Sequence, residues 1–330
     1  MRRGVHAERD TAGHDPTPTV SVVVATHNRA EDLERMLGGL AAQERKPDEV
    51  IVVDDGSTDS TSTVLAGHEG AGGLPLRVVR RPDAAGPATA REDGWRASTG
   101  DLIAFTDDDC VPRPGWLAGA EAAWAGRPDT FVQGRTDPEE EHPGPFSRSL
   151  SVDRLNAAFP TCNMAYPREL LERIGGFDTE TYGRDPGGED CDLAWRAIEA
   201  GARPVFADDA VVRHAVTHPG PIGKLRIAAR WTTPMTAYAR HPGLRKAQFI
   251  HWIFWKDIHY LFVRALIGFL LPTRWSVLRN WLMYPYLKNV WARGRLEGGG
   301  PFLAPYFMLH DLIEVWAVAR AGIRTRTPML

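Results

Sequence analysis

The sequence predicts an α/β fold in which a mostly parallel central sheet is followed by a helical, aromatic and basic C-terminal region. Strand-like and helix-like segments alternate from about residue 19 to residue 125, which indicates a parallel sheet with helices on both faces. Seven of the eleven tryptophans lie beyond residue 220. The chain has 330 residues, of which 43% are hydrophobic and 25% charged, an ordinary composition for a globular protein.

Apolar runs separated by helical patterns define the elements of the predicted sheet. Buried strands are expected at residues 20–25 (VSVVVA), 49–53 (EVIVV), 76–79 and 102–105. Helices are expected at residues 31–43, 88–98 and 114–125. The polar clusters ATHNR, VDDGS and TDDD follow the first, second and fourth of these strands. Because ligands bind at the carboxyl ends of parallel strands, these clusters predict one shared site.

Asp107, Asp108 and Asp109 concentrate negative charge at the end of the fourth strand. Such a cluster is unfavourable unless a cation lies close to it. The alternative is a solvated turn, because aspartate also bonds its own backbone in turns.

The region beyond residue 220 differs in charge from the rest of the chain. Residues 221–330 hold 16 Lys and Arg against 4 Asp and Glu, whereas the first 220 residues hold 23 against 38. The stretches 249–272, 274–291 and 306–327 mix aromatic, aliphatic and basic residues, and none contains the ~20 apolar residues of a membrane span. We expect helices in a membrane interface. The alternative is packing on the sheet or on a second subunit, as in a homodimer.

The N-terminus and the cysteines indicate in which cellular compartment the protein is expected. Residues 1–18 are polar, without the apolar segment of a signal peptide, and we expect a flexible tail. Cys110, Cys162 and Cys191 are odd in number and lack CxxC spacing, which favours a reducing compartment. The expected location is cytoplasmic, peripheral on the inner face of the membrane.

Five motifs, in order, resemble family 2 glycosyltransferases of the GT-A fold. They are SVVVATHNRAEDLERMLGGLAAQ, DEVIVVDDGSTDST, GPATAREDGWRASTGDLIAFTDDD, CNMAYPRELLERIGGFDTE and GGEDCDLAWRAIEAGARPVFADDAVVRH. The resemblance implies an inverting transfer from a UDP-, GDP- or dTDP-sugar to an acceptor hydroxyl. It places the catalytic domain at residues 19–221 and leaves 222–330 as the C-terminal region.

The resemblance also assigns the donor site. The residues that it implies for the base and ribose are Thr26, Asn28, Arg29, Asp54 and Asp55. Arg91 would reach the nucleotide; a surface ion pair with Glu92 or Asp93 is its alternative.

A divalent metal, Mg²⁺ or Mn²⁺, is implied on the diphosphate, since these ions take oxygen ligands and bridge phosphates. Asp109 would be a direct ligand, Asp107 would face the ribose or metal, and Asp108 would lie between them. His214 would add a metal or phosphate contact, although a lone histidine is more often structural.

The acceptor needs a general base, and Glu189 and Asp190 follow a Gly-Gly pair at a predicted helix start. Adjacent side chains on a helix diverge by ~100°, so the two carboxylates have different roles. The resemblance implies Asp190 as the base and Glu189 as a residue that orients the acceptor. Asp192 and Arg196 would support them.

Two other functions fit parts of the pattern. Asp107 to Val111 matches the DxDx(T/V) loop of haloacid-dehalogenase phosphatases, but these need a lysine downstream and none lies between residues 111 and 189. A non-catalytic nucleotide-sugar or membrane-surface binding protein would not need both Asp109 and Asp190. Nucleic acid is not an expected partner, because the C-terminal aromatics are too densely mixed with aliphatic residues for a solvated groove.

The acceptor is the least defined partner. Residues 227–231 (IAARW) differ from the QxxRW motif of processive enzymes at Ile227, which disfavours a polymer synthase. Residues 137–161 match no motif of the family. We expect a lipid-linked or cell-envelope glycan acceptor, with a soluble natural product as the alternative.

Overall fold

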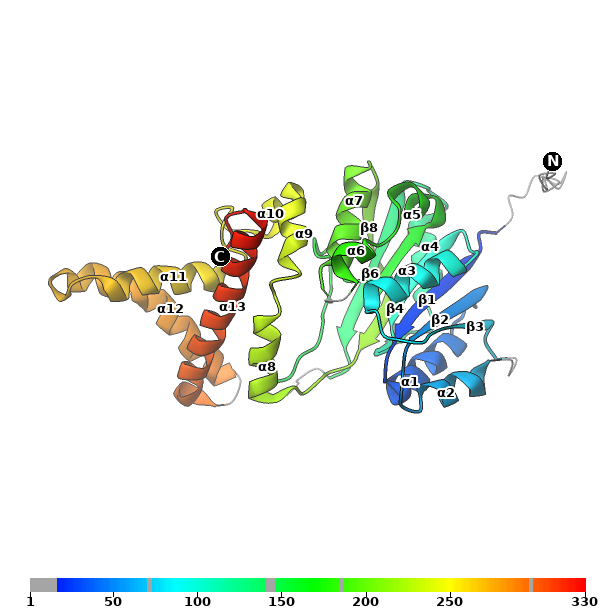
Figure 1. The fold of residues 1–330 in the computed structure, drawn as a ribbon, viewed down its shortest axis with the longest axis horizontal. Coiled ribbons are helices and arrows are strands. Elements are labelled where there is room, and N and C mark those ends of the chain that lie inside the picture. The colour runs from blue at the N-terminus through cyan, green and yellow to red at the C-terminus, as the bar shows by residue number, and fades with distance from the viewer. Residues whose placement is uncertain (1–16, 70–72, 141–145, 184–186, 297–298) are drawn as a thin grey trace.

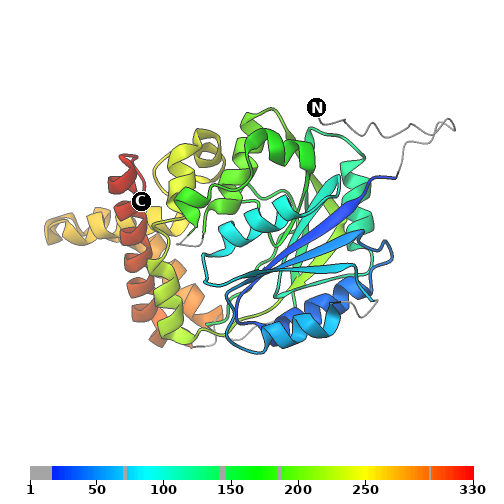
Figure 2. The ribbon, with the colours of Figure 1, turned by 45° about the vertical axis from the view of Figure 1, so that its right-hand side comes forward.

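The computed structural model describes residues 17–69, 73–140, 146–183, 187–296 and 299–330. The tail expected at residues 1–18 lies outside these ranges except for its last two residues. Figures 1 and 2 show a sheet with its helices, followed by a group of C-terminal helices on one side.

The described residues form one eight-stranded sheet of order β3-β2-β1-β4-β7-β6-β8-β5. Its strands are β1 (Val20–Thr26), β2 (Glu49–Asp55), β3 (Leu76–Arg81), β4 (Leu102–Asp107), β5 (Cys110–Pro112), β6 (Thr130–Pro138), β7 (Asn163–Pro167) and β8 (Arg203–His214). The strands β1 to β4 are parallel to one another, β7 is antiparallel to both of its neighbours, and β5 is antiparallel to β8. The prediction of a mostly parallel sheet is confirmed.

Helices cover both faces of the sheet, as predicted, and each face has its own core. The helices α1 (Ala30–Ala41), α2 (Thr61–His68) and α4 (Trp116–Trp124) cover one face, and α3 (Pro87–Ala97), α5 (Arg168–Ile174) and α7 (Glu189–Glu199) the other. Side chains alternate along β1, so Val22 and Val24 enter the first core and Val23 the second. A strand buried on both faces is a nearly continuous apolar run, which explains VSVVVA, where Ser21 is the one polar residue.

Two details differ from the prediction. Helix α4 begins at Trp116 rather than at residue 114, because the Trp116 N–H bonds to the Arg113 carbonyl in a turn. Strands β6 and β7 were not expected, since β6 (TFVQGRTDP) carries polar residues and has a register shift at Gly134 and Arg135.

The C-terminal region is helical, as predicted. Its helices are α8 (Gly220–Ala229), α9 (Met235–Arg240), α10 (Pro242–Gln248), α11 (Asp257–Leu270), α12 (Ser276–Leu296) and α13 (Ala304–Thr325). Helix α9 packs on α7, while α11 and α12 extend away from the sheet (Figure 1). Among the described residues, no helix combines the length and apolarity needed to cross a bilayer.

Candidate functional site

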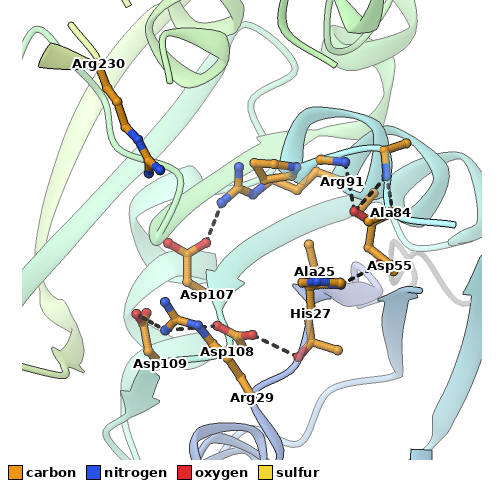
Figure 3. Close-up of a pocket in the computed structure, with 15 residues that line it drawn as sticks. Ala25, His27, Arg29, Asp55, Ala84, Arg91, Asp107, Asp108, Asp109 and Arg230 are labelled. Atoms are coloured by element: carbon orange, nitrogen blue, oxygen red, sulfur yellow. Dashed lines mark hydrogen bonds and ion pairs between the residues drawn. The ribbon is translucent and has the colours of Figure 1, made fainter. Parts of the chain in front are cut away.

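A cavity of about 800 Å³ opens at the carboxyl ends of β1, β2 and β4 (Figure 3). Its volume is within the range of ligand sites. Its lining residues are Ala25, Thr26, His27, Arg29, Asp55, Ala84, Ala85, Gly86, Pro87, Ala90, Arg91, Asp107, Asp108, Asp109 and Arg230. The shared site expected from the three polar clusters is therefore one continuous cavity.

The three aspartates at the end of β4, Asp107 to Asp109, have different partners (Figure 3). Arg91 Nη2 donates to Asp107 Oδ1 at 2.6 Å, and Arg29 Nη1 donates to Asp109 Oδ2 at 2.6 Å. Asp108 Oδ2 accepts from the Thr26 hydroxyl at 2.8 Å. Burial raises the pKa of Asp108 to about 7, and the charge on Asp109 adds to this effect while Arg29 opposes it. Only Asp108 therefore lacks a short ion pair.

Asp109, Cys110 and His214 form a candidate metal site, with one possible ligand atom of each within 4.8 Å of the others. The antiparallel pairing of Cys110 with His214 joins β5 to β8 and brings them together. His214 Nδ1 donates to the Ala215 carbonyl at 2.8 Å, and its Nε2 lies 3.8 Å from the Asp109 carboxylate. A carboxylate oxygen and an imidazole nitrogen fit a divalent cation.

Arg91 connects the aspartate cluster to the start of α7. It is buried, and its Nη1 donates to Glu189 Oε1 at 3.1 Å. The alternative of a surface ion pair is wrong, because Glu92 bonds to Trp95 and Arg96 while Asp93 bonds to Arg81.

Helix α7 begins at Glu189, directly after Gly187 and Gly188, as predicted. Both glycines have positive φ, and an added Cβ would lie 2.8 Å from Pro234 at Gly187 and 3.0 Å from it at Gly188. Burial raises the pKa of Asp190 to about 7, with a further contribution from the negative charge of Glu189. A carboxylate with such a pKa is suited to accept a proton near neutral pH.

Two predicted donor residues bond to loops instead of lining the cavity. Asn28 Oδ1 accepts from the N–H groups of Thr58 and Asp59 at 2.7 and 3.2 Å. Asp54 Oδ1 accepts from the Ser57 N–H at 3.0 Å. Both side chains hold the loop after β2 in shape.

Asp55 lines the cavity and also fixes part of its wall. Its carboxylate accepts from the N–H groups of Ala85 and Gly86 at 2.9 and 2.8 Å. Gly86 has φ +95° and begins α3, so Asp55 positions the helix that carries Arg91.

Asp192 and Arg196 lie behind the cavity wall. Asp192 is fully buried and accepts from Arg196 Nε at 2.7 Å and from Arg240 at 3.2 Å. Although burial opposes its ionisation, hydrogen bonds from His241 and Arg196 hold the pKa of Asp192 at about 2. Arg196 also donates to the carbonyls of Ile174 and Gly176. Both residues therefore join α7 to its surroundings.

His27 and Arg230 line the cavity, yet neither was predicted. His27 Nδ1 donates to the Asp55 carbonyl at 2.7 Å. Arg230 comes from the end of α8 and points into the cavity from the side opposite β2 (Figure 3). The sequence feature that could have indicated Arg230 is the segment IAARW, which has the Arg-Trp of QxxRW.

Comparisons with known proteins agree with this geometry. Residues 21–178 match the family model described as glycosyl transferase family 2. The chain is 31% identical over 212 residues to the pre-mycofactocin glycosyltransferase of Mycobacterium tuberculosis, covering 59% of this chain and 42% of that protein. It is 32% identical over 219 residues to the validoxylamine A glucosyltransferase of Streptomyces hygroscopicus subsp. limoneus, covering 54% and 48%. The chain spans about half the length of these curated relatives.

Solved structures show the same fold. A mannosyltransferase from Pyrobaculum calidifontis, in complex with GDP-Man and Mn²⁺, has a TM-score of 0.61 and 24% identity, covering 92% of this chain and 87% of that one. GalNAc-T7 with UDP, GalNAc and Mn²⁺ has a TM-score of 0.53 and 18% identity, covering 74% and 54%. The fold is that of GT-A nucleotide-sugar proteins. Residues 21–178, just under half of the chain, are therefore similar to glycosyl transferase family 2.

Proposed function

We propose that the protein is an inverting glycosyltransferase that moves a sugar from a nucleotide-diphosphate sugar to an acceptor hydroxyl. The observation that carries the proposal is the arrangement around Arg91. This buried cation bridges Asp107 of the cavity to Glu189, the neighbour of Asp190. A donor site and a carboxylate with a pKa of about 7 thus share one network. The family relationship and the GT-A fold support the same reaction class.

The donor would lie along the strand ends, with base and ribose near Thr26, His27 and Asp55. Its diphosphate would lie between the aspartates and Arg230, whose positive charge can stabilise the leaving group. Asn28 and Asp54 would contribute by shaping the loop rather than by contact. The donor would be a UDP-, GDP- or dTDP-sugar, and its nucleotide is left open.

Asp109, with His214 and Asp107, would hold Mg²⁺ or Mn²⁺. The ion would act as a Lewis acid for the departing diphosphate. Arg29, which now bonds to Asp109, would move toward the diphosphate oxygens when the carboxylate binds a metal.

Asp190 would remove the proton of the acceptor hydroxyl as that oxygen attacks the anomeric carbon opposite the diphosphate. Attack from that side inverts the configuration. Glu189 accepts from Arg91 and, at 2.7 Å, from the Gly187 N–H. Glu189 would orient the acceptor while Asp190 takes the proton.

The acceptor would be a lipid-linked or cell-envelope glycan intermediate. We propose a peripheral location on the inner face of the membrane, supported by the excess of Lys and Arg and the concentration of tryptophans beyond residue 220.

A donor panel tests the reaction class. We expect nucleotide release from one sugar nucleotide, dependent on Mn²⁺ or Mg²⁺ and abolished by EDTA. Asp190→Asn should lower kcat by about 10²- to 10⁴-fold and leave donor affinity unchanged in calorimetry. Asp208→Asn, an exposed carboxylate, is the matched control. Full activity of Asp190→Asn would refute the assignment of the base.

A further inference from the structure

The helices α11 and α12 form a hairpin, residues 257–296, that extends away from the rest of the molecule (Figures 1 and 2). On α12, Val277, Trp281 and Tyr284 are 84%, 62% and 64% exposed. They are three and four residues apart, so they lie on one helix face. At the end of α11, Phe269 and Leu270 are 66% and 73% exposed. An apolar surface of this extent marks an interaction site.

The hairpin beyond its first residue, Asp257, carries charge of one sign. Residues 258–296 contain six Lys and Arg and no Asp or Glu. Asp311 and Glu314 of α13 are buried at the base of the hairpin, where Asp311 pairs with Arg293 and Glu314 with Lys256. These two carboxylates are therefore used internally, and Asp257, the first residue of α11, is the one acidic side chain of the hairpin itself.

Internal contacts hold the aromatic face outward. Pro285 lacks the N–H that would bond to the Trp281 carbonyl in a regular helix. Arg264 of α11 donates to this carbonyl at 2.9 Å, and its guanidinium lies 4.1 Å from the centre of the Trp281 ring. The same arginine thus satisfies the carbonyl, fixes the indole and joins α11 to α12.

We propose that the α11–α12 hairpin is the membrane-binding element and that it binds the headgroup layer of a bilayer containing anionic lipids. Arg274, Trp275 and Trp281 line a groove of about 580 Å³ at its tip, where the cation would meet lipid phosphate and the indoles would lie at headgroup depth. A symmetric contact with a second copy would place two cationic faces against each other. The inference rests on the proposed membrane contact and is independent of the transfer reaction.

Sedimentation of the full chain with vesicles tests the hairpin against the rest of the C-terminal region. Trp281→Ser should lower binding to phosphatidylcholine–phosphatidylglycerol vesicles several-fold. Trp316→Ser on α13 is the matched control, because Trp316 is 64% exposed, and it should bind as the unmodified chain does. Equal losses in both variants would overturn the assignment to the hairpin.

Charge reversal tests the lipid. Arg274→Glu should lower binding to anionic vesicles at least about fivefold, since each basic residue near such a surface contributes about that factor. Arg154→Glu, on an exposed side chain of the sheet domain, should have no effect. Binding that is unchanged in Arg274→Glu would refute anionic recognition.

Two further readouts separate the explanations. Circular dichroism and nucleotide binding of the same preparations show whether each variant is folded. A chain that binds vesicles but no nucleotide would refute the proposed function and keep the hairpin assignment. Absence of vesicle binding in the full chain, with a dimer that Trp281→Ser dissociates, would replace the lipid by a second copy.

Discussion

At the scale of single residues, the site keeps several carboxylates close together by giving each a different partner. Asp107 bonds to Arg91 and Asp109 to Arg29. Asp108 and Asp190 lack such short ion pairs among the described residues, and the pKa of each is raised to about 7, mainly by burial. The carboxylates that are paired with arginine can serve in binding, and those with a raised pKa can serve in proton transfer.

The raised pKa of Asp190 predicts the pH dependence of the reaction. A general base acts when it is ionised, so kcat should fall about tenfold per unit of pH below about 7 and level off above it. Initial rates at saturating donor, acceptor and metal between pH 5 and 9 measure this profile. Residual activity in Asp190→Asn should lose the acid limb. An identical limb in that variant would assign the proton to another group.

Arg230 predicts that the C-terminal region takes part in donor binding. Arg230→Ala should weaken binding of the nucleoside diphosphate about tenfold or more, because a hydrogen bond to a charged group contributes about 1.5–3 kcal/mol. Arg226→Ala is the matched control: Arg226 is exposed one turn earlier on α8 and does not line the cavity. Calorimetry with the product nucleotide measures both. Equal affinities would remove Arg230 from the site.

Sequence reasoning located the strand ends but not every side chain that lines the cavity. Thr26 and Asp55 line it because they are the last residues of β1 and β2, and Arg91 lines it from α3. Asn28 and Arg230 show the limit of such reasoning. The same polar residue type can cap a loop or face a ligand, and an arginine some 120 residues beyond the aspartates reaches the cavity only through tertiary packing.

At the scale of elements, the apolar strands were predictable and the antiparallel ones were not. Strands β1, β2 and β4 are buried on both faces and therefore have continuous apolar runs. Strand β6 (TFVQGRTDP) has only a short apolar pair among polar residues and contains a register shift, so it lacks that signal. The pairing of β5 with β8, which brings Cys110 to His214, depends on register that a single sequence does not encode locally.

Helix α13 anchors the hairpin through buried charge, and this contact predicts a stability effect. Glu314 is 3% exposed and accepts from Lys256 at 2.7 Å and from His259 at 3.1 Å. Glu314→Gln should lower the free energy of unfolding by about 1.5–3 kcal/mol, since it removes the buried carboxylate that bonds to the partly exposed Lys256 and to the buried His259 ring. Asp257→Asn, an exposed carboxylate at the start of α11, should change it by less than about 0.5 kcal/mol. Urea denaturation followed by tryptophan fluorescence measures both.

The contacts of Glu314 also determine how the stability of the chain changes at low pH. Burial opposes the ionisation of Glu314, but bonds from His259 and Lys256 lower its pKa from 4.5 to about 2. Its stabilisation is therefore present above pH 4.5 and is lost as the pH falls toward 2. The difference in stability between Glu314→Gln and the unmodified chain should shrink over that range. A difference that does not change with pH would show that the charge of Glu314 is not responsible.

At the scale of the whole molecule, the sheet domain and the C-terminal region share a core. Cys191 and Trp195 of α7 pack with Met235 and Tyr238 of α9, and Val318 of α13 joins the same cluster. Arg240 and His241 bond to the buried Asp192 of α7. The boundary predicted at residues 221 and 222 therefore marks a change in amino-acid composition, and the segments on its two sides pack against each other.

This shared core predicts that the chain unfolds as one cooperative unit. Thermal melts followed by tryptophan fluorescence and by nucleotide binding should give the same midpoint temperature. Glu314→Gln should lower that midpoint equally in both measurements, although residue 314 is far from the cavity residues in sequence. A chain that ends at residue 219 should aggregate, because it exposes the apolar face of α7 that α9 now covers. If that short chain were soluble and bound nucleotide with unchanged affinity, the two parts would be independent and Arg230 would have no role in donor binding.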